Sequence, residues 1–468
     1  MKNSISIFVN GVHYNVSGED AFMPLADFLR YKIHKRGTKI VCAEGDCGAC
    51  TILSAKLDTD RPIYKSINSC IGFVFQYAGH SIVTVEGLES EEGLSPVQDS
   101  MAKNHGAQCG YCTPGIVTSM TALMEDSITQ KFEVTEKKVK NYLTGNLCRC
   151  TGYDPIIKAG VQADRSKYKL LNERYPLDIQ SIDSLKINFQ DKELFLPKTL
   201  KEALAYKNEN PDCKILSGAT DLGVLSNKRR MKLIKILCLN QVEDLFKISK
   251  ESDCIQIGSS VSLDSVEASL KNDFNEFSNL IHLFASPQIK NAGTLVGNLA
   301  NGSPIGDTIP FMLVADAVLN LSSVDGSRSI NLNDFYLGYK TLDLKENEII
   351  TSVSIPKTKD YFKMYKVSLR KDLDISAVTF AGRISIDNKK ISKIKIALGG
   401  VGPTVLRMDT VEQELTGKEF KISHFKKSAL EIKSLLNPYS DVRGSSEFRK
   451  QLCHNLLLKF YKDSEASL

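Results

Sequence analysis

Residues 42–51 read Cys42-Ala-Glu-Gly-Asp-Cys47-Gly-Ala-Cys50-Thr51, and a fourth cysteine, Cys70, follows further along the chain. The spacing C-x4-C-x2-C with a distant fourth cysteine is typical of thiolates that hold a [2Fe–2S] cluster. The two glycines inside the loop allow the backbone to fold tightly and to point N–H groups at the sulfurs. Zinc also accepts four thiolates, but its sites usually come as two C-x2-C pairs. We therefore predict that these four cysteines bind an iron–sulfur cluster.

A second set of four cysteines follows within the first third of the chain. Cys109 and Cys112 are spaced C-x2-C, and Cys148 and Cys150 are spaced C-x-C. Taken alone, this pattern leaves a zinc knuckle open as an alternative. The nearby first set favours a second [2Fe–2S] cluster, because two clusters in one short segment form a relay for single electrons.

The segment around the first set predicts a small sheet packed on a helix. Ile5, Ile7 and Val9 alternate before Asn10-Gly11, a strong hairpin signal because a type I′ turn needs positive φ at both central residues. Apolar residues then recur at helical spacing over 25–33, and strands are expected from Ile52 onward and over 82–85. This order of elements is that of a β-grasp ferredoxin.

The segment around the second set is predicted to be helical from about residue 93. Pro114 suits the first turn of a helix, and an apolar stripe runs from Ile116 to Met124. Another short helix is expected over 136–147, ended by Gly145-Asn146. We therefore expect the second set of cysteines to lie at helix ends.

A polar stretch over residues 165–190 is predicted to be a linker. After it, strand-like runs, glycine loops and helices alternate to about residue 355, and the remainder mixes strands (391–398) with a helical tail (446–461).

Two loops are rich in small residues, 215–223 (Ile-Leu-Ser-Gly-Ala-Thr-Asp-Leu-Gly) and 293–307. Such loops can bring N–H groups close to phosphates, but neither fits the Rossmann or Walker pattern. On sequence alone, plain turns remain the favoured interpretation.

Composition excludes several classes of function. A length of 468 residues predicts about three domains. The net charge of +5, without basic blocks, gives no support for binding nucleic acid. No apolar run is long enough to span a membrane, and the start lacks the pattern of a signal peptide, so we expect a cytoplasmic protein with reduced thiols.

Smaller features stay ambiguous. Cys213, Cys238, Cys254 and Cys453 share no spacing, and Cys238 and Cys254 are predicted to be buried thiols. Residues 228–230 (Lys-Arg-Arg) favour a solvated helix face over a phosphate site. Lys366, Arg370 and Lys371 near Asp374 could flank a cofactor or lie on an exposed strand.

Together, these motifs resemble a known family. Residues 42–51, 108–115 (Gln-Cys-Gly-Tyr-Cys-Thr-Pro-Gly) and 141–153 (Asn-Tyr-Leu-Thr-Gly-Asn-Leu-Cys-Arg-Cys-Thr-Gly-Tyr) closely resemble the iron–sulfur portion of xanthine dehydrogenases. The downstream loops and residues 370–376 resemble the FAD domain of that family. The chain as a whole is similar to the small subunit of bacterial-type, two-subunit members.

The resemblance implies an α+β multidomain fold. Its parts would be a plant-type, β-grasp [2Fe–2S] domain (1–88), a helical-bundle [2Fe–2S] domain (89–164), the linker (165–190), an α+β FAD-binding domain (191–358) and a C-terminal α+β subdomain (359–468).

The resemblance also implies which residues contact FAD. The pyrophosphate would lie on the loop formed by Ile215, Leu216, Ser217, Gly218, Ala219, Thr220, Asp221 and Leu222. Further contacts would come from Phe284, Thr294, Gly297, Asn298, Asp307, Ile350 and Lys366. Where the family usually has Gly-Gly-Asn, this chain has Val296-Gly297-Asn298. A valine cannot adopt all the backbone angles open to glycine, so a local difference is expected there.

The function implied is electron transfer from a molybdopterin-binding large subunit that oxidises xanthine or hypoxanthine. Gln108 would face the molybdopterin, FAD would pass electrons to NAD⁺, and two small and two large subunits would form a heterotetramer. Two alternatives remain: the same role in another molybdenum hydroxylase (aldehyde, nicotinate or another purine), or a non-catalytic zinc-bound or redox-sensing scaffold.

Overall fold

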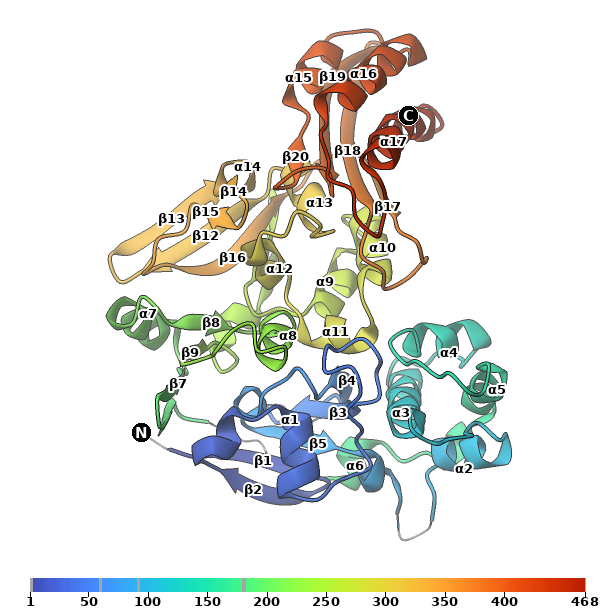
Figure 1. Ribbon diagram of the computed structural model, residues 1–468, viewed down its shortest axis with the longest axis vertical. Helices are drawn as coiled ribbons and strands as arrows, with labels where there is room; N and C mark the ends of the chain where they lie inside the picture. The colour runs from blue at the N-terminus through green and yellow to red at the C-terminus, as the bar shows by residue number, and fades with distance from the viewer. Residues whose placement is uncertain (1–2, 59–60, 91–92, 179–181, 468) are drawn as a thin grey trace. The chain divides into compact units, whose positions relative to one another are not determined.

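The computed structural model describes residues 3–58, 61–90, 93–178 and 182–467. The chain forms two compact units (Figure 1). The first comprises residues 1–206, 212–243 and 286–293, and the second comprises residues 207–211, 244–285 and 294–468. Within the described residues, no helix is both long enough and apolar enough to cross a membrane.

The first unit begins with a five-stranded sheet in the order β2-β1-β5-β3-β4. Its strands are β1 (Ile5–Val9), β2 (Val12–Val16), β3 (Thr51–Lys56), β4 (Lys65–Asn68) and β5 (His80–Val83). The predicted hairpin is confirmed: Val9 pairs with Val12, and Asn10 and Gly11 have φ of 50° and 82°. Ile5, Ile7 and Val9 are fully buried on one face.

The predicted helix over 25–33 is irregular in the structure. A short α1 (Leu25–Asp27) continues directly as a π-helical turn, Phe28–Lys32. Phe28 and Leu29 are buried in the core of the sheet, so the apolar spacing identified the buried face correctly. Short 3-10 helices at Gly18–Phe22, Val74–Tyr77 and Val85–Leu88 complete this domain.

A helical group follows, made of α2 (Pro96–Lys103), α3 (Thr113–Thr129), α4 (Glu136–Tyr142) and α5 (Asp154–Gln162). Pro114 lies in the first turn of α3, as expected. Helix α4 ends earlier than predicted, because Leu143 leaves the helical conformation. Cys112 caps α3, but Cys109, Cys148 and Cys150 lie in loops rather than at helix ends, so that expectation holds for Cys112 alone.

The stretch predicted to be a linker is partly structured in its described residues. It contains a 3-10 turn (Arg165–Lys167), α6 (Leu171–Arg174) and β6 (Leu185–Phe189), whereas residues 179–181 lie outside the described part. Strand β6 pairs with β7 in a second sheet of order β6-β7-β9-β8. The other elements of this part are β7 (Lys192–Leu196), α7 (Leu200–Glu209), β8 (Lys214–Leu216), α8 (Leu222–Asn227), β9 (Lys235–Cys238), a 3-10 turn (Glu243–Phe246) and α11 (Pro287–Ala292).

The second unit contains a sheet of order β10-β11-β16-β12-β13 with helices packed on it. Its strands are β10 (Ile248–Lys250), β11 (Cys254–Gly258), β12 (Val318–Ser323), β13 (Gly326–Asn331) and β16 (Ile349–Pro356). A small hairpin pairs β14 (Tyr336–Gly338) with β15 (Thr341–Leu342). The helices are α9 (Leu263–Leu270), α10 (Asn275–Phe284), α12 (Leu295–Asn301), α13 (Ile309–Val314) and α14 (Leu332–Phe335).

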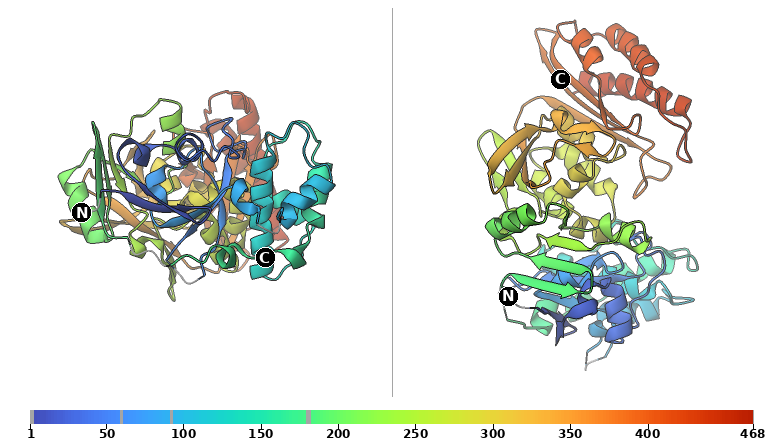
Figure 2. Two further views of the ribbon diagram at one scale, coloured as in Figure 1. Left: turned by 90° about the horizontal axis from the view of Figure 1, so that it is seen from below. Right: turned by 60° about the vertical axis from the view of Figure 1, so that its left-hand side comes forward.

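The C-terminal part of the second unit is a four-stranded sheet covered by helices on one face (Figure 2). The strands are β17 (Tyr361–Val367), β18 (Val378–Asp387), β19 (Lys390–Gly399) and β20 (Leu406–Arg407). The helices are α15 (Asp409–Leu415), α16 (Ile422–Leu435) and α17 (Ser446–Glu465). The strand predicted over 391–398 and the helical tail over 446–461 are both confirmed.

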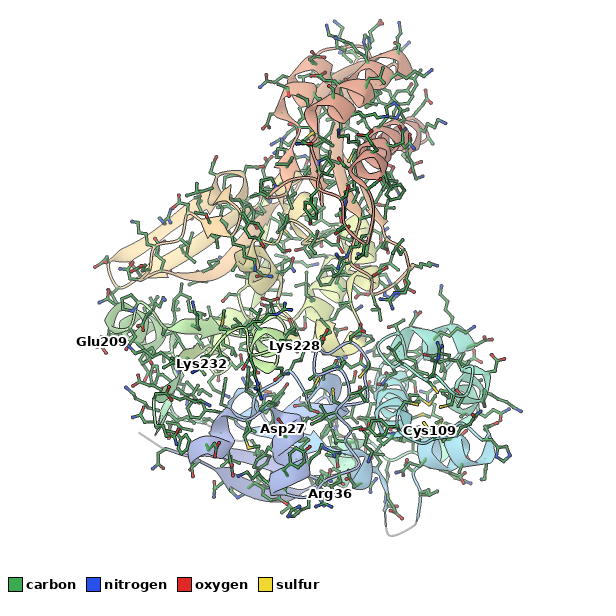
Figure 3. All side chains as sticks on the ribbon, in the orientation of Figure 1. Asp27, Arg36, Cys109, Glu209, Lys228 and Lys232 are labelled. Atoms are coloured by element: carbon green, nitrogen blue, oxygen red, sulfur yellow. The ribbon has the colours of Figure 1, made fainter. Side chains whose placement is uncertain are left out.

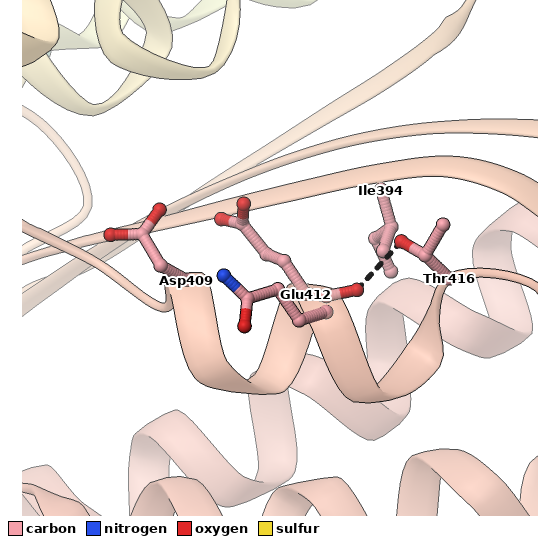
Figure 4. Close-up of a pocket in the computed structure, with 5 residues that line it drawn as sticks. Ile394, Asp409, Glu412 and Thr416 are labelled. Carbon is pink, nitrogen blue, oxygen red and sulfur yellow. Dashed lines mark hydrogen bonds between the residues drawn. The ribbon is translucent and has the colours of Figure 1, made fainter.

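An open depression of about 380 Å³ lies beside α15 (Figure 4). It is lined by Ile394, Asp409, Glu412, Gln413 and Thr416. Its polar groups serve the fold: the Glu412 carboxylate accepts from Arg407 and from the backbone of Ile396, and the Thr416 hydroxyl donates to the Glu412 carbonyl at 2.7 Å.

Candidate functional site

The first set of cysteines lies on a loop that folds back tightly on itself. Gly45 and Gly48 have φ of 76° and 67°, a conformation that glycine adopts at little cost. The backbone N–H groups of Glu44 and Cys47 both point to Cys42 Sγ at 3.4 Å. Hydrogen bonds from the Cys47 and Cys70 thiols, assisted by these backbone donors, lower the pKa of Cys42, which favours the thiolate that a metal needs.

The four thiols of this set lie side by side. Cys42 lies beside Cys47 and Cys70, and Cys50 lies beside Cys70. Among the described residues, no group of three or more histidine, cysteine, aspartate or glutamate side chains is arranged to hold a metal ion. Four neighbouring cysteine thiols are the ligand type of a [2Fe–2S] cluster, in which four thiolates share two irons. Cys50 and Cys70 are buried, and Asn68 Nδ2 donates to Cys50 Sγ at 3.7 Å.

Helix α8 closes over this cysteine loop. Asn227 Nδ2 donates to the carbonyls of Ala43 (3.0 Å) and Cys70 (2.8 Å). A Cβ at Gly223 would lie 2.1 Å from the carbonyl oxygen of Ile71, so the helix approaches the loop backbone as closely as glycine allows. Lys228 is exposed, as predicted, and it pairs with Glu44 and donates to the Cys42 carbonyl at 3.4 Å.

The second set of cysteines lies between α2 and α5 (Figure 3, where Cys109 is labelled). The sulfurs of Cys109 and Cys150 are 3.3 Å apart on the surface, and Cys112 lies beside Cys148. Thr151 Oγ1 contacts Cys148 Sγ at 3.2 Å, and the N–H of Cys148 donates to the hydroxyl of Tyr153 at 2.8 Å. This second paired set fits a cluster that is accessible from outside, and Gln108 beside it is exposed.

A backbone hydrogen bond joins the two sets directly. The N–H of Leu147 donates to the carbonyl of Cys47 at 3.0 Å. Cys47 belongs to the first set, and Leu147 precedes Cys148 of the second. Of the remaining cysteines, Cys213, Cys238 and Cys453 are buried, whereas Cys254 is partly exposed, contrary to the prediction.

The first group of predicted FAD contacts forms the turn between β8 and α8. Leu216 is buried at the end of the strand, and the Ser217 carbonyl accepts from Gln76 Nε2 at 3.0 Å. A Cβ at Gly218 would meet the carbonyl oxygen of Ala292 at 2.4 Å, and Ala219 has a φ of 57°. The strand, tight turn and helix agree with a loop that exposes N–H groups to a phosphate.

The second group lies in the second unit, around α12. Thr294 caps this helix, its Oγ1 accepting from the N–H of Gly297 at 3.0 Å, and Asn298 Oδ1 accepts from Thr308 at 2.6 Å. Val296 lies inside α12 and is buried. Because Val296 adopts ordinary helical backbone angles, this position does not require a glycine. The backbone therefore gives no reason for the local difference that was expected where the valine replaces the family's glycine.

Asp307 and Lys366 form a buried ion pair. Lys366 Nζ donates to Asp307 Oδ2 at 2.5 Å, and to the Asp374 carbonyl and Ser376 Oγ at 2.7 Å each. Ser376 Oγ donates to Asp307 Oδ1 at 2.6 Å, and Thr379 also donates there. Arg370, in contrast, is exposed and pairs with Asp374 at 3.5 Å. Lys366 is therefore part of a buried ion pair and Arg370 lies on the surface, a distinction that the sequence pattern left open.

The other two predicted FAD contacts are apolar. Phe284 is half-buried at the end of α10, and Ile350 is buried on β16. Sequence reasoning missed Asn227, which lies next to the ambiguous basic run, and Gln288, which belongs to no motif. Neither residue type nor spacing marks them, because their partners are carbonyls and side chains far away in sequence.

Three family profiles match the chain in succession. The [2Fe-2S] binding domain matches residues 84–161, the FAD binding domain in molybdopterin dehydrogenase matches residues 187–358, and the CO dehydrogenase flavoprotein C-terminal domain matches residues 363–464.

Curated relatives match nearly the whole chain. It is 30% identical to xanthine dehydrogenase 1 of Arabidopsis thaliana, over 97% of this chain and 39% of that protein. It is 28% identical to xanthine dehydrogenase/oxidase of Gallus gallus, over 98% of this chain and 40% of that protein. The chain thus spans about two-fifths of the length of these relatives.

Solved structures share the fold of somewhat more than half of the chain. Carbon monoxide dehydrogenase from Hydrogenophaga pseudoflava superposes with a TM-score of 0.55 at 24% identity, over 58% of this chain and 96% of that chain. Quinoline 2-oxidoreductase from Pseudomonas putida 86 gives a TM-score of 0.54 at 24% identity, over 57% of this chain and 94% of that chain.

Proposed function

Because the chain carries the [2Fe–2S] and FAD-binding region of a xanthine dehydrogenase-like molybdenum hydroxylase, we propose that it is the electron-transfer subunit of a xanthine dehydrogenase. In this role it passes electrons from a molybdopterin site on a large partner subunit, through two [2Fe–2S] clusters, to FAD and on to NAD⁺. The observation that carries the proposal is the pair of four-thiol sets joined by one hydrogen bond, Leu147 N–H to Cys47 O.

In this proposal, each set of four cysteines binds one cluster. Cys42, Cys47, Cys50 and Cys70 hold the first cluster, and Cys109, Cys112, Cys148 and Cys150 hold the second. When bound, the clusters carry single electrons, and FAD exchanges one or two. The exposed pair Cys109 and Cys150 makes the second set the entry side, because an outside donor can approach it. The buried Cys50 and Cys70 exclude water from the first set.

Residues 215–222 are proposed to contact the FAD pyrophosphate with backbone N–H groups of the turn. For the second unit we propose FAD contacts from Phe284, Thr294, Gly297, Asn298, Asp307, Ile350 and Lys366. The buried Asp307–Lys366 pair would fix its part of that surface, because each charge is already compensated by the other and by neighbouring hydroxyls.

The substrate, the acceptor and the assembly of the whole enzyme are part of the proposal. Xanthine or hypoxanthine is proposed as the substrate of the partner, NAD⁺ as the acceptor, and two small with two large subunits as the assembly. We place the domain boundaries at 88, 164, 190 and 358. The free cysteines fit a reducing compartment such as the cytoplasm.

The proposal is tested with Cys112→Ser in the assembled enzyme. Loss of this ligand should abolish electron flow from xanthine to NAD⁺, because it interrupts the entry side. Reduction of a dye by NADH should continue, since it needs only the flavin. The matched control is Cys254→Ser, a partly exposed thiol outside both sets, which should retain both activities.

Metal and flavin analysis of the purified protein is the second test of the proposed function. The purified protein should contain iron and sulfide equivalent to two [2Fe–2S] clusters, with FAD equimolar to the chain. Zinc without flavin would instead support a scaffold, and simultaneous loss of both activities in a folded Cys112→Ser protein would contradict the proposed order of transfer.

A further inference from the structure

Four buried polar side chains meet where the two cysteine sets approach each other. Thr51, Ser119, Asn146 and Gln288 come from β3, α3, the loop after α4 and α11, and each is at most 3% exposed. Gln288 Nε2 donates to Asn146 Oδ1 (2.9 Å), Ser119 Oγ (3.1 Å) and Thr51 Oγ1 (3.3 Å). Buried polar networks of this kind occur when all members are held in one arrangement.

The network acts on the carbonyl of Gly48, which lies between the ligands Cys47 and Cys50. This oxygen accepts from the N–H of Thr51 (3.1 Å), from Thr51 Oγ1 (2.6 Å) and from Asn146 Nδ2 (3.1 Å). Asn146 in turn precedes Leu147, whose N–H bonds the Cys47 carbonyl. The orientation of the Asn146 amide therefore fixes the first cysteine loop against the second.

The glycines at this junction pack so closely that none of them could be replaced by a residue with a Cβ without a shift of its neighbours. A Cβ at Gly48 would lie 2.1 Å from the carbonyl oxygen of Gly145, and a Cβ at Gly115 would lie 2.1 Å from that of Gly48. A Cβ at Gly145 would lie 2.4 Å from Gln288 Oε1. The contact thus depends on two close backbone approaches, on the close approach of Gln288 to Gly145, and on the side-chain network beside them.

The direction of the hydrogen bonds explains why a glutamine is present. The hydroxyls of Ser119 and Thr51 donate to Asn146 Oδ1 and to the Gly48 carbonyl, so their oxygens remain as acceptors. A polar group placed among the hydroxyl oxygens of Ser119 and Thr51 and the amide oxygen of Asn146 must therefore be a hydrogen-bond donor. Gln288 Nε2 supplies it, although its Oε1 finds no partner among the described atoms. An unpaired buried oxygen is costly, which indicates that the donor side of this amide is what the site requires.

Helix α11 is itself anchored to the first cysteine domain. Asn291 Nδ2 donates to the carbonyl of Ser66 at 2.8 Å, and Ile289 packs against the cluster of Cys50, Cys70 and Ile71. The helix lies within the segment that matches the FAD-binding domain, 187–358. Gln288 therefore reaches from a different domain of the sequence into the junction between the cysteine loops.

We propose that Gln288 is a positioning residue for electron transfer between the two clusters, an inference that rests on the function proposed above. By fixing the Asn146 amide, it keeps the Leu147 N–H on the Cys47 carbonyl and holds the two ligand loops at a constant separation. Groups that act through a ligand's neighbours commonly set the geometry of the ligand itself.

The test compares Gln288→Leu with Gln241→Leu in the assembled enzyme. Gln241 is a second buried glutamine of the same unit, whose Nε2 donates to the Ala78 carbonyl at 2.9 Å, so both changes remove a buried amide. Hydrogen–deuterium exchange should become about tenfold faster in peptides covering 46–51 and 144–149 for Gln288→Leu alone. After rapid mixing with NADH, spectroscopic reduction of the second cluster should be slowed by a similar factor, with unchanged iron and flavin content.

Equal exchange and equal reduction rates in the two variants would overturn the proposal. If Gln288→Leu does not fold, Ser119→Ala serves instead, because it removes the other donor to Asn146 Oδ1 and should accelerate exchange in the same two peptides. Absence of iron–sulfur clusters or flavin from the unchanged protein would refute the proposed function, whereas the exchange comparison would still decide whether Gln288 fixes the loops.

Discussion

Replacing Asn227 by leucine should loosen the first cysteine loop without touching a ligand. The side chain donates to the carbonyl of Ala43, which follows the first cysteine of the set, and to the carbonyl of Cys70, the fourth. Ala43 needs this support, because its φ of 54° is unfavourable for a residue with a Cβ. Two hydrogen bonds at about 0.5–1.5 kcal/mol each amount to about 1–3 kcal/mol for local opening of the loop.

That free energy corresponds to an increase of about 5- to 150-fold in the population of the open loop. The assay is the rate at which an excess of chelator removes iron from the purified protein, followed by loss of visible absorbance. About half of the iron should leave faster, since the second set does not contact Asn227. The control is Asn240→Leu, which removes a single bond to the Gln76 carbonyl (3.3 Å). Equal rates in the two variants would refute the reasoning.

Three further changes test other parts of the chain. Asp307→Ala would leave Lys366 as an unpaired buried cation at a cost of about 3–5 kcal/mol, so flavin content should fall with iron unchanged; full flavin retention would contradict the role. Gly48→Ala should prevent cluster assembly, because the new Cβ would lie 2.1 Å from the Gly145 carbonyl oxygen, whereas Gly110→Ala, also at positive φ but in open space, should retain iron. Burial raises the pKa of Glu125 from 4.5 to about 7. Between these values the folded carboxyl keeps its proton and the unfolded one has lost it, so the free energy of unfolding should fall by up to about 3 kcal/mol as pH rises from about 4.5 to 7. Urea titrations of Glu125→Gln should lack that slope, and an unchanged slope would refute the assignment.

Local patterns predicted the local elements well. Asn10-Gly11 has the positive φ angles of the expected turn, and the buried face of β1 follows from alternation, because both properties depend on near neighbours in sequence. Helix boundaries were less predictable. The turn at Phe28–Lys32 is π-helical and α4 ends at Tyr142, since tertiary contacts decide such details. Strand β6 (Leu185–Phe189) was missed although its apolar residues alternate, because the polar residues before it led the whole stretch 165–190 to be predicted as a linker. Its partner, β7, lies beyond that stretch.

Cysteine spacing by itself predicted two sets of four cysteines as ligands, because thiolates are a chemically distinctive residue type and their separation along the chain limits what they can hold. Tertiary structure alone decided what surrounds them. Asn227, Gln288 and the Leu147–Cys47 hydrogen bond join segments far apart in sequence, through backbone carbonyls that every residue carries. A carbonyl has no sequence signature, and a lone amide side chain has many possible partners, so these contacts exist only once the chain has folded.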